Sequence, residues 1–269
     1  MRFTIVTPSF NQGQFIERTL RSVLEQRGDF ELEYLVIDGG STDETLPILE
    51  RYRGRLSYVS EPDEGQSDAI NKGFARATGE VVAWLNSDDV YLPGALDAVA
   101  RALNEPGVRW CFGQCRVIDE DDREIRRAIA WYKNRLSRRY SLRRLLTKDF
   151  IPQPATFFRR DLLLEAGPLD PACHYAMDYD LWLRLARLSE PAFIARDLAG
   201  FRWHGASKSS EGYAKAAWEA FAAAKRHARP SERLALAEHY VHVLSLIAGY
   251  RLLDLLGPGA PKSSGHGRA

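Results

Sequence analysis

The sequence predicts an α/β protein built on a doubly wound, mostly parallel, Rossmann-like sheet with helices at the C-terminus. Within the first hundred residues, short apolar runs alternate with segments of helical periodicity, which is the rhythm of strand–helix–strand units. The run 81–85 is apolar throughout, as expected for a parallel strand that helices cover on both faces. In such sheets, ligands bind beyond the carboxyl ends of the strands.

Each predicted element follows from its local pattern. Strands are predicted at residues 3–7, 34–38, 56–60 and 81–85, and in the less regular second half at 110–113, 116–119, 155–158 and 198–203. A helix is predicted around 15–24, and a second begins after a capping box formed by Ser41 and Glu44. Further helices are predicted around 69–77, 161–166, 179–188, 213–227 and 231–256. We expect one α/β domain over 1–210, a helical extension over 211–256 and a disordered tail over 257–269.

Composition argues against several classes of protein. The net charge is +1, so nothing global indicates a nucleic-acid partner. The chain opens directly into a predicted strand, and no apolar run reaches the roughly 18 residues of a spanning helix, so we expect neither a signal peptide nor a membrane span. The cysteines Cys111, Cys115 and Cys173 are few and odd in number, which indicates a reducing, cytoplasmic setting. The first two lack the second pair of ligands that a zinc site would need.

Three clusters of small or polar residues follow predicted strands, at 7–9, 38–40 and 86–89. The last contains the adjacent carboxylates Asp88 and Asp89, which repel each other unless a positive group lies beside them. Mg²⁺ or Mn²⁺ would satisfy this pair and would bridge to a substrate phosphate. The alternative is that Asp89 caps a helix over 93–103. The sequence has neither a dinucleotide-binding G-x-G-x-x-G after the first strand nor an ATP-binding P-loop.

Over residues 3–205 the sequence resembles the family 2 glycosyltransferases of the GT-A fold. The segments that carry the resemblance are Thr7-Pro8-Ser9-Phe10-Asn11, Val36-Ile37-Asp38-Gly39-Gly40-Ser41-Thr42-Asp43, Glu61-Pro62-Asp63-Glu64-Gly65, Asp68-Ala69-Ile70-Asn71-Lys72-Gly73, Leu85-Asn86-Ser87-Asp88-Asp89 and Asp178-Tyr179-Asp180-Leu181-Trp182. The resemblance implies a nucleotide-sugar donor and a divalent cation.

The resemblance also implies roles for individual residues. The family's D-x-D motif maps to Asn86, Ser87 and Asp88, so Asp88 would be the metal ligand and Asn86 would contact ribose. Asp89 would support Asp88 or bind donor hydroxyls. Asp38 would bind the base, typically uracil. The full set expected to bind the nucleotide sugar is Thr7, Pro8, Ser9, Asn11, Asp38, Gly40, Gln66, Asp68, Lys72, Asn86, Ser87, Asp89, Gln153 and Lys208. Gln66, Asp68 and Lys72 are included because Ile70 stands where many members carry an arginine.

The family places its general base at the first acid of an E/D-D-x-D/E type motif, which here is Asp178, with Asp180 as the fallback. The alternative for Asp178 is a helix cap. His204 is expected to complete the metal shell or to touch the diphosphate, and Lys208 to pair with a phosphate. The alternative for His204 is an ordinary loop histidine. Gln153 is expected near the acceptor or the donor sugar.

Residues 123–148 contain ten basic side chains and one acidic side chain, Glu124, together with Trp131, Tyr132 and Tyr140. One interpretation is a solvated helical face. The other is attraction to anionic lipid or to a lipid diphosphate acceptor, which would place the enzyme at the cytoplasmic surface of a membrane. The helix predicted at 231–256 would then assist membrane contact, or pack on the domain, or join two subunits in a homo-oligomer.

The function predicted is an inverting transferase that moves a sugar from a nucleotide diphosphate, UDP by resemblance, to a hydroxyl of a glycan or lipid-linked acceptor in cell-surface polysaccharide or glycolipid synthesis. Two alternatives stay open: a sugar-phosphate nucleotidyltransferase, and a catalytically silent nucleotide-sugar-binding module. The first would need a Gly-rich, basic loop after the first strand, which 7–11 is not. The intact Asp38, Asp88 and Asp178 argue against the second.

Overall fold

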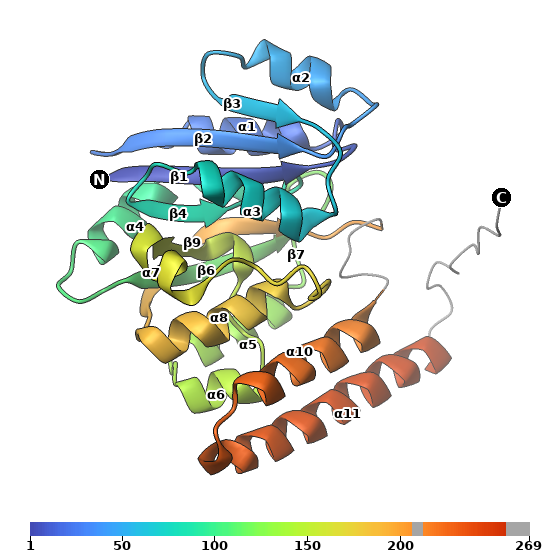
Figure 1. Ribbon diagram of the computed structural model, residues 1–269. Helices are drawn as coiled ribbons and strands as arrows, with labels where there is room; N and C mark the ends of the chain where they lie inside the picture. The colour runs from blue at the N-terminus through green and yellow to red at the C-terminus, as the bar shows by residue number, and fades with distance from the viewer. Residues whose placement is uncertain (206–211, 257–269) are drawn as a thin grey trace.

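The computed structural model describes residues 1–205 and 212–256, so the predicted tail 257–269 and Lys208 lie outside the described residues. A single curved sheet forms the centre, with helices on both of its faces (Figure 1). Over the described residues its strands follow the order β3-β2-β1-β4-β8-β6-β9-β5, with β7 paired beside β6. The α/β fold class predicted from the sequence is confirmed.

The first half has the predicted alternation of strands and helices. The strands are β1 (Arg2–Ser9), β2 (Glu31–Asp38), β3 (Ser57–Ser60) and β4 (Val81–Trp84), and they pair in parallel. The helices are α1 (Ile16–Leu24), α2 (Thr45–Arg51) and α3 (Gln66–Arg76). The apolar faces of α1 and α2 pack on one side of the sheet and that of α3 on the other, which explains why every residue of β4 is buried.

The predicted capping box is wrong. Helix α2 begins at Thr45, and its N-cap Glu44 makes no side-chain cap bond. The Ser41 hydroxyl instead donates to Asp38 Oδ1 at 2.5 Å. A buried carboxylate needs hydrogen-bond donors more than an exposed helix end does, so Asp38 takes this hydroxyl.

The second half of the sheet is mixed in direction. Its elements are β5 (Val90–Tyr91), α4 (Ala95–Leu103), β6 (Trp110–Ile118), β7 (Glu124–Ile125), α5 (Arg127–Ser137), α6 (Leu142–Thr147), η1 (Gln153–Ala155), β8 (Thr156–Arg159), α7 (Arg160–Ala166), α8 (Met177–Leu188) and β9 (Ala192–Arg202). Strand β8 runs antiparallel to both β4 and β6, whereas β6 and β9 are parallel. The two strands predicted at 110–113 and 116–119 are one strand, β6, whose pairing with β9 shifts register around Gln114.

The C-terminal extension is a pair of helices, α10 (Tyr213–His227) and α11 (Arg233–Leu256), joined through η2 (Pro230–Glu232). The two helices run side by side along α6 and α8, at the bottom of the view in Figure 1. Ala223, Ala224 and Ala235 belong to the same hydrophobic core as Trp84 of the central sheet. The extension therefore shares the core of the α/β domain. Within residues 1–205 and 212–256, no helix is both long and apolar enough to span a bilayer.

Candidate active site

A cavity of about 710 Å³ opens beyond the carboxyl ends of the parallel strands, where the fold class places a ligand. Its lining contains nine of the residues singled out from the sequence: Pro8, Ser9, Gln66, Asn86, Ser87, Asp88, Gln153, Asp178 and His204. These residues come from six separate segments of the chain. The fold thus gathers a large part of the predicted site into one hollow.

The acidic turn after β4 meets the end of β9 at this cavity. Asp88 Oδ2 lies 3.0 Å from His204 Nε2, and the Asp88 carbonyl accepts a hydrogen bond from Arg202 Nε at 2.7 Å. The His204 ring packs on Phe15, with ring centres 4.8 Å apart. His204 is therefore held against the turn from two sides. A carboxylate oxygen and an imidazole nitrogen stand together as two candidate metal ligands.

Asn86 lies at the centre of a chain of amide hydrogen bonds. Its Oδ1 accepts from Gln66 Nε2 at 2.8 Å, and its Nδ2 donates to Gln153 Oε1 at 3.2 Å. Gln153 Nε2 in turn donates to the Trp84 carbonyl at 2.8 Å. A carboxylate at position 86 could not donate to Gln153, so the asparagine in the D-x-D position belongs to this network.

Ser9 presents a hydroxyl that the described protein leaves unpaired. The residue is 4% exposed, it lines the cavity, and its Oγ has no hydrogen-bond partner among the described residues. A buried hydroxyl without a partner costs about 1–3 kcal/mol. A polar ligand in the cavity would remove that cost.

Comparison with other proteins identifies the family. Residues 4–166 match the family described as Glycosyl transferase family 2. An uncharacterized glycosyltransferase of Mycobacterium tuberculosis is 33% identical over 214 residues, which cover 77% of this chain and 78% of that protein. The chain belongs to glycosyl transferase family 2. An uncharacterized glycosyltransferase of Nostoc is 26% identical, over 93% of this glycosyltransferase and 77% of the relative.

Solved structures show the same fold. A mannosyltransferase of Pyrobaculum calidifontis, in complex with GDP-Man and Mn²⁺, superposes with a TM-score of 0.70 at 20% identity, over 96% of this chain and 76% of that one. Residues 1–349 of TarS from S. aureus, in complex with UDP-GlcNAc, give a TM-score of 0.67 at 19% identity, over 89% and 72% of the two chains. The glycosyltransferase thus has the GT-A fold.

Asp178 of this glycosyltransferase lies in the first turn of α8 and lines the cavity. It does not cap the helix, because the N-cap is Ala176 and makes no side-chain cap bond. Its Oδ1 accepts the N–H of Tyr179 at 2.8 Å.

Asp149 is a cavity residue that the sequence interpretation missed. It lies between α6 and η1, it lines the cavity, and part of its surface is exposed. Enclosure by protein and the neighbouring charge of Asp178 raise the pKa of Asp149 from 3.8 to about 7, although Lys133 partly opposes the shift. No local pattern marks this residue, which directly follows a basic run. Arg126 was missed as well; its guanidinium lies 3.7 Å from the centre of the Trp203 ring in the same cavity.

Changing Asp149 to asparagine should stabilise the glycosyltransferase, and more so at pH 8 than at pH 5. Between 3.8 and about 7 the unfolded chain has released a proton that the folded protein retains, so stability falls as the pH rises through this window. Asparagine carries no proton to lose and escapes that penalty. Melting temperatures of both proteins at the two pH values would measure it, and an equal difference at both would contradict the raised pKa.

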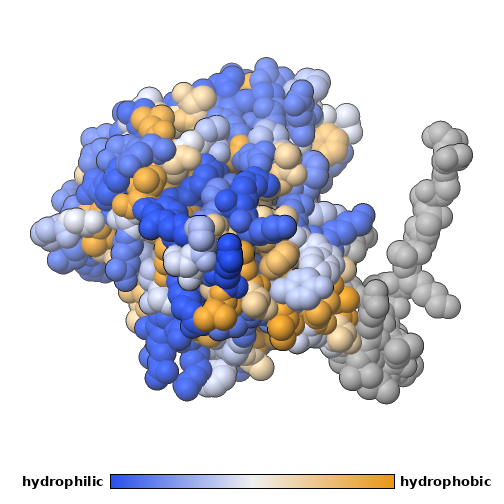
Figure 2. Space-filling view, turned by 60° about the horizontal axis from the view of Figure 1, so that its bottom comes forward, coloured by the Kyte–Doolittle hydropathy of each residue, from blue (hydrophilic) through white to orange (hydrophobic). Residues whose placement is uncertain are grey.

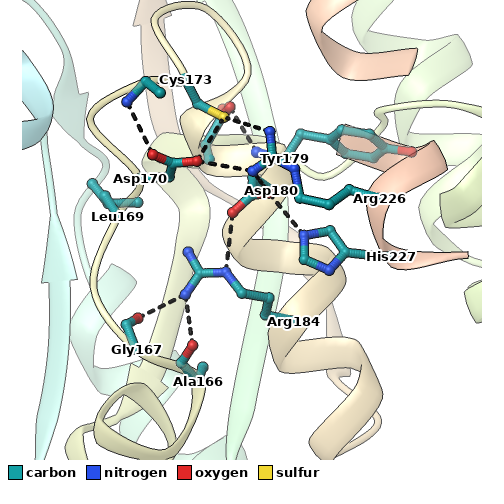
Figure 3. Close-up of polar contacts among 12 residues, drawn as sticks. Ala166, Gly167, Leu169, Asp170, Cys173, Tyr179, Asp180, Arg184, Arg226 and His227 are labelled. Atoms are coloured by element: carbon teal, nitrogen blue, oxygen red, sulfur yellow. Dashed lines mark hydrogen bonds and ion pairs between the residues drawn. The ribbon is translucent and has the colours of Figure 1, made fainter. Parts of the chain in front are cut away.

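Asp180, the fallback base, is a structural residue. Its side chain is 2% exposed and lies outside the cavity lining. As Figure 3 shows, it accepts hydrogen bonds from Arg184 Nε at 3.0 Å and from His227 Nε2 at 2.8 Å, with Arg226 at 3.4 Å. Burial alone would raise the pKa of Asp180, but the His227 hydrogen bond and the charges of Arg184 and Arg226 lower it below 3.8. The prediction of a catalytic role for Asp180 is therefore wrong.

Substitution of Asp180 with asparagine should lower the free energy of unfolding by about 3 kcal/mol, because it removes the buried carboxylate that pairs with the partly buried Arg184 and His227. The depressed pKa means that this stabilisation is present above pH 3.8 and is lost as the pH falls below it. Chemical denaturation at pH 7 would measure the change. The control is Asp170→Asn, which breaks a solvent-exposed ion pair with Arg226 and should cost less than about 1 kcal/mol. Equal losses in the two variants would contradict the assignment.

Asp38 and Gly40 also lie outside the cavity lining. The buried Asp38 carboxylate accepts four hydrogen bonds, from the N–H groups of Gly40 and Ser41 and from the hydroxyls of Ser41 and Ser60. Three of these bonds fall on Oδ2 and one on Oδ1, and they close the turn after β2, where Gly40 has a φ of 85°.

Thr7 lies within β1 and Asn11 in the loop that follows it, and neither residue lines the cavity. The buried Thr7 hydroxyl is 3.0 Å from the Tyr34 hydroxyl, because strand alternation turns it into the sheet layer. Asn11 Oδ1 accepts the N–H of Thr42 at 2.9 Å, and its own N–H donates to the Ser41 hydroxyl at 2.7 Å. Thr7 thus contacts β2, and Asn11 joins the loop after β1 to the loop after β2.

Asp68 and Lys72 form an ion pair of 2.9 Å on α3, outside the cavity lining. Their spacing of four residues on one helix brings them together, and each satisfies the other's charge. Of the three residues considered as replacements for the missing arginine, only Gln66 lines the cavity.

Asp89 is fully buried and does not line the cavity, so it is placed to support Asp88 and not to touch donor hydroxyls. Its Oδ1 accepts the N–H of Arg202 at 2.8 Å, and its Oδ2 accepts from Asn86 at 3.3 Å. Burial and the adjacent Asp88 charge raise its pKa well above the usual value. The alternative of a helix cap is also wrong, since α4 begins at Ala95 after Gly94. Asp89 fastens the acidic turn to β9 and so places Asp88 beside His204.

Proposed function

We propose that this glycosyltransferase is a metal-dependent, inverting enzyme that transfers a sugar from a UDP-linked donor to a hydroxyl of a glycan or lipid-linked acceptor. We propose further that it works on the cytoplasmic side of the membrane in cell-surface polysaccharide or glycolipid synthesis. The observation that carries the enzymatic proposal is that Asp88, His204 and Asp178 line one cavity. A pair of metal ligands and a separate carboxylate are the two parts that such a transfer needs.

The reaction requires one displacement at the anomeric carbon. The acceptor oxygen bonds to that carbon while its proton passes to the Asp178 carboxylate, and the bond from the carbon to the diphosphate oxygen breaks. The nucleoside diphosphate leaves with the electron pair of that bond. One attack on the face opposite the leaving group inverts the configuration, and no covalent nucleophile is needed.

Asp88 and His204 fit a divalent cation that is completed by its substrate. Among the described residues, no group of three or more His, Cys, Asp or Glu side chains could hold a metal. Mg²⁺ and Mn²⁺ are commonly bound by one or two protein ligands, with water and phosphate oxygens filling the remaining positions. The imidazole ligand favours Mn²⁺ over the harder Mg²⁺. When bound, the cation would neutralise the charge that develops on the diphosphate. The archaeal mannosyltransferase with GDP-Man and Mn²⁺ supports this assignment.

The proposed donor rests on the shape of the cavity as well as on its charges. The ring of Phe10 is 60% exposed at the cavity and offers a surface on which a base could stack. The unpaired Ser9 hydroxyl would bond to the nucleotide. The TarS complex with UDP-GlcNAc supports uridine, whereas the complex with GDP-Man makes guanosine the competitor to test.

A thermal-shift screen of UDP-, GDP- and dTDP-sugars with and without Mn²⁺ tests the donor. The melting temperature should rise most with a UDP-sugar, and only when Mn²⁺ is present. Mn²⁺-dependent hydrolysis of that donor would then separate an active transferase from a silent binding module. Release of pyrophosphate from a nucleoside triphosphate and a sugar phosphate would instead indicate a nucleotidyltransferase. If nucleotide sugars raised the melting temperature equally with and without Mn²⁺, the proposed metal site would be contradicted.

A further inference from the structure

Helix α5 exposes most of its length, and the exposed side is both basic and aromatic. It contacts the domain through a narrow stripe of Ala130, Asn134 and Ser137, the first and last of which are buried. Arg127, Trp131 and Arg135 follow one another at intervals of four residues on the exposed side. The Trp131 side chain is 63% exposed, with the Arg135 guanidinium 5.8 Å from its ring centre. The Tyr132 ring is 44% exposed, and its hydroxyl accepts from Lys148 Nζ at 2.8 Å.

Helix α11 carries an exposed apolar stripe. Its inner side packs on the domain through Ala235, His239 and Val243, which are at most 2% exposed. Its outer side presents Leu234, Ala237, Val241, Leu244 and Ala248, which recur at alternating intervals of three and four residues and are all exposed. Leu234 and Val241 have 75% and 61% of their surface in contact with solvent. Such a continuous apolar stripe on a helix surface marks an interaction site.

Helix α6 connects the basic surface of α5 to the apolar surface of α11. Helix α6 follows α5 after a short link and packs against α11, where Arg143 forms an ion pair with Glu238 and His239 Nδ1 bonds to the Leu146 carbonyl. Figure 2 brings forward the bottom of the view in Figure 1, where α6 and α11 lie, and shows hydrophobic side chains gathered beside hydrophilic ones. We call the exposed side chains of Arg127, Trp131, Arg135, Arg143, Leu234, Val241 and Leu244 the basic–apolar face.

We propose that the basic–apolar face docks on an anionic phospholipid bilayer. Residues 123–148 carry ten basic side chains and one acidic side chain in a chain whose net charge is +1, so the rest of the chain is net negative. Anionic headgroups attract this local excess of positive charge, the aromatic rings suit the interfacial layer, and the apolar stripe enters the acyl boundary.

Charge complementarity favours a bilayer over a second copy of the chain. A symmetric pair formed through α11 would bring α6 of each copy close to the other, because α6 lies along α11. The basic side chains of both copies would then repel each other. A bilayer offers the opposite sign of charge to all of them at once.

Docking would also bring the cavity close to the membrane surface. Arg126, Ile129 and Lys133 line the cavity from α5, while Arg127, Trp131 and Arg135 face outward from the same helix. An acceptor embedded in the bilayer would therefore reach the site along α5. Binding to the bilayer is independent of the proposed reaction, because it involves neither donor nor acceptor.

Co-sedimentation of the full chain with vesicles tests the proposal. The vesicles contain phosphatidylcholine alone, or phosphatidylcholine with about a third phosphatidylglycerol, at low salt and at ~0.5 M salt. We expect binding only to the anionic vesicles, weakened by salt. The pair Arg127→Glu and Arg135→Glu should weaken the binding roughly tenfold or more, and Arg127→Gln with Arg135→Gln should weaken it less. The pair Val241→Ser and Leu244→Ser should weaken the binding to a similar degree.

The matched control places the same charge change elsewhere. Arg55→Glu with Arg101→Glu alters exposed residues away from the basic–apolar face and should leave vesicle binding within about twofold. Absence of wild-type binding to anionic vesicles at low salt would overturn the proposal, and so would an equal loss in the control. Concentration-dependent dimerisation that Val241→Ser and Leu244→Ser abolish, without vesicle binding, would assign the face to a second copy.

Discussion

Replacing Asp178 with asparagine should reduce sugar transfer about 10²- to 10⁴-fold, while the donor still binds with nearly its original affinity. Asparagine keeps the shape of the side chain at the start of α8 but cannot take a proton from the acceptor hydroxyl. The loss should fall on kcat, because the carboxylate acts only as the acceptor oxygen attacks. Initial rates of transfer together with the donor dissociation constant in Mn²⁺ would measure it.

Asp149 supplies the informative comparison for Asp178. The two carboxylates share one region of the cavity, and the Asp178 charge contributes to the raised pKa of Asp149. With a pKa of about 7, Asp149 is only partly ionised at neutral pH, so Asp149→Asn should retain more of the transfer rate than Asp178→Asn. If the Asp178→Asn variant were fully active and the separate Asp149→Asn variant were inactive, Asp149 would be the base and the assignment of Asp178 would be wrong.

Asp88→Asn should weaken Mn²⁺-dependent donor binding roughly 100-fold or more. An amide oxygen can still approach a cation, but it cannot neutralise it, and Asp88 is the one carboxylate found within hydrogen-bonding distance of His204 among the described residues. His204→Ala should have a smaller effect in the same direction, about 10- to 100-fold, because the carboxylate remains. Titration of the donor at several Mn²⁺ concentrations would measure both effects.

A second carboxylate in the cavity provides a control for the general effect of removing a negative charge from the lining. Asp63 lines the same hollow, but its Oδ1 accepts the N–H of Gly65 at 2.8 Å, and no contact to His204 is present. Asp63→Asn should leave the Mn²⁺ dependence unchanged. If Asp63→Asn and Asp88→Asn weakened donor binding equally, the cation would not be located at Asp88.

Local pattern was sufficient to predict the first half of the fold. The apolar run of β4 and the helical spacing of α1 and α3 are encoded in neighbouring residues, and the structure confirms them. Strand direction in the second half is not encoded in that way. A run such as 155–158 is equally apolar in either direction, and only the path through α5 and α6 makes β8 antiparallel.

The same limit explains the errors at the site. The acids after β2 and β4 look alike in the sequence, yet Asp38 and Asp89 are buried and Asp88 lines the cavity. Their hydrogen-bond partners Ser60 and Arg202 are 22 and 113 residues away in the sequence. No local pattern could therefore show which carboxylates are buried and hydrogen-bonded within the protein. Asp180 likewise depends on His227, 47 residues later.

The contact between Asp180 and His227 sets a rule for building chimeras of this enzyme. Asp180 stands two residues after Asp178 on α8, and its partners Arg226 and His227 end α10. Arg187 of the same helix pairs with Glu232 at the start of the last helix. A hybrid enzyme joined at residue 210 would replace the residues that pair with Asp180 and Arg187 of α8 by those of the foreign C-terminal segment. A junction after Glu232 would leave them in place.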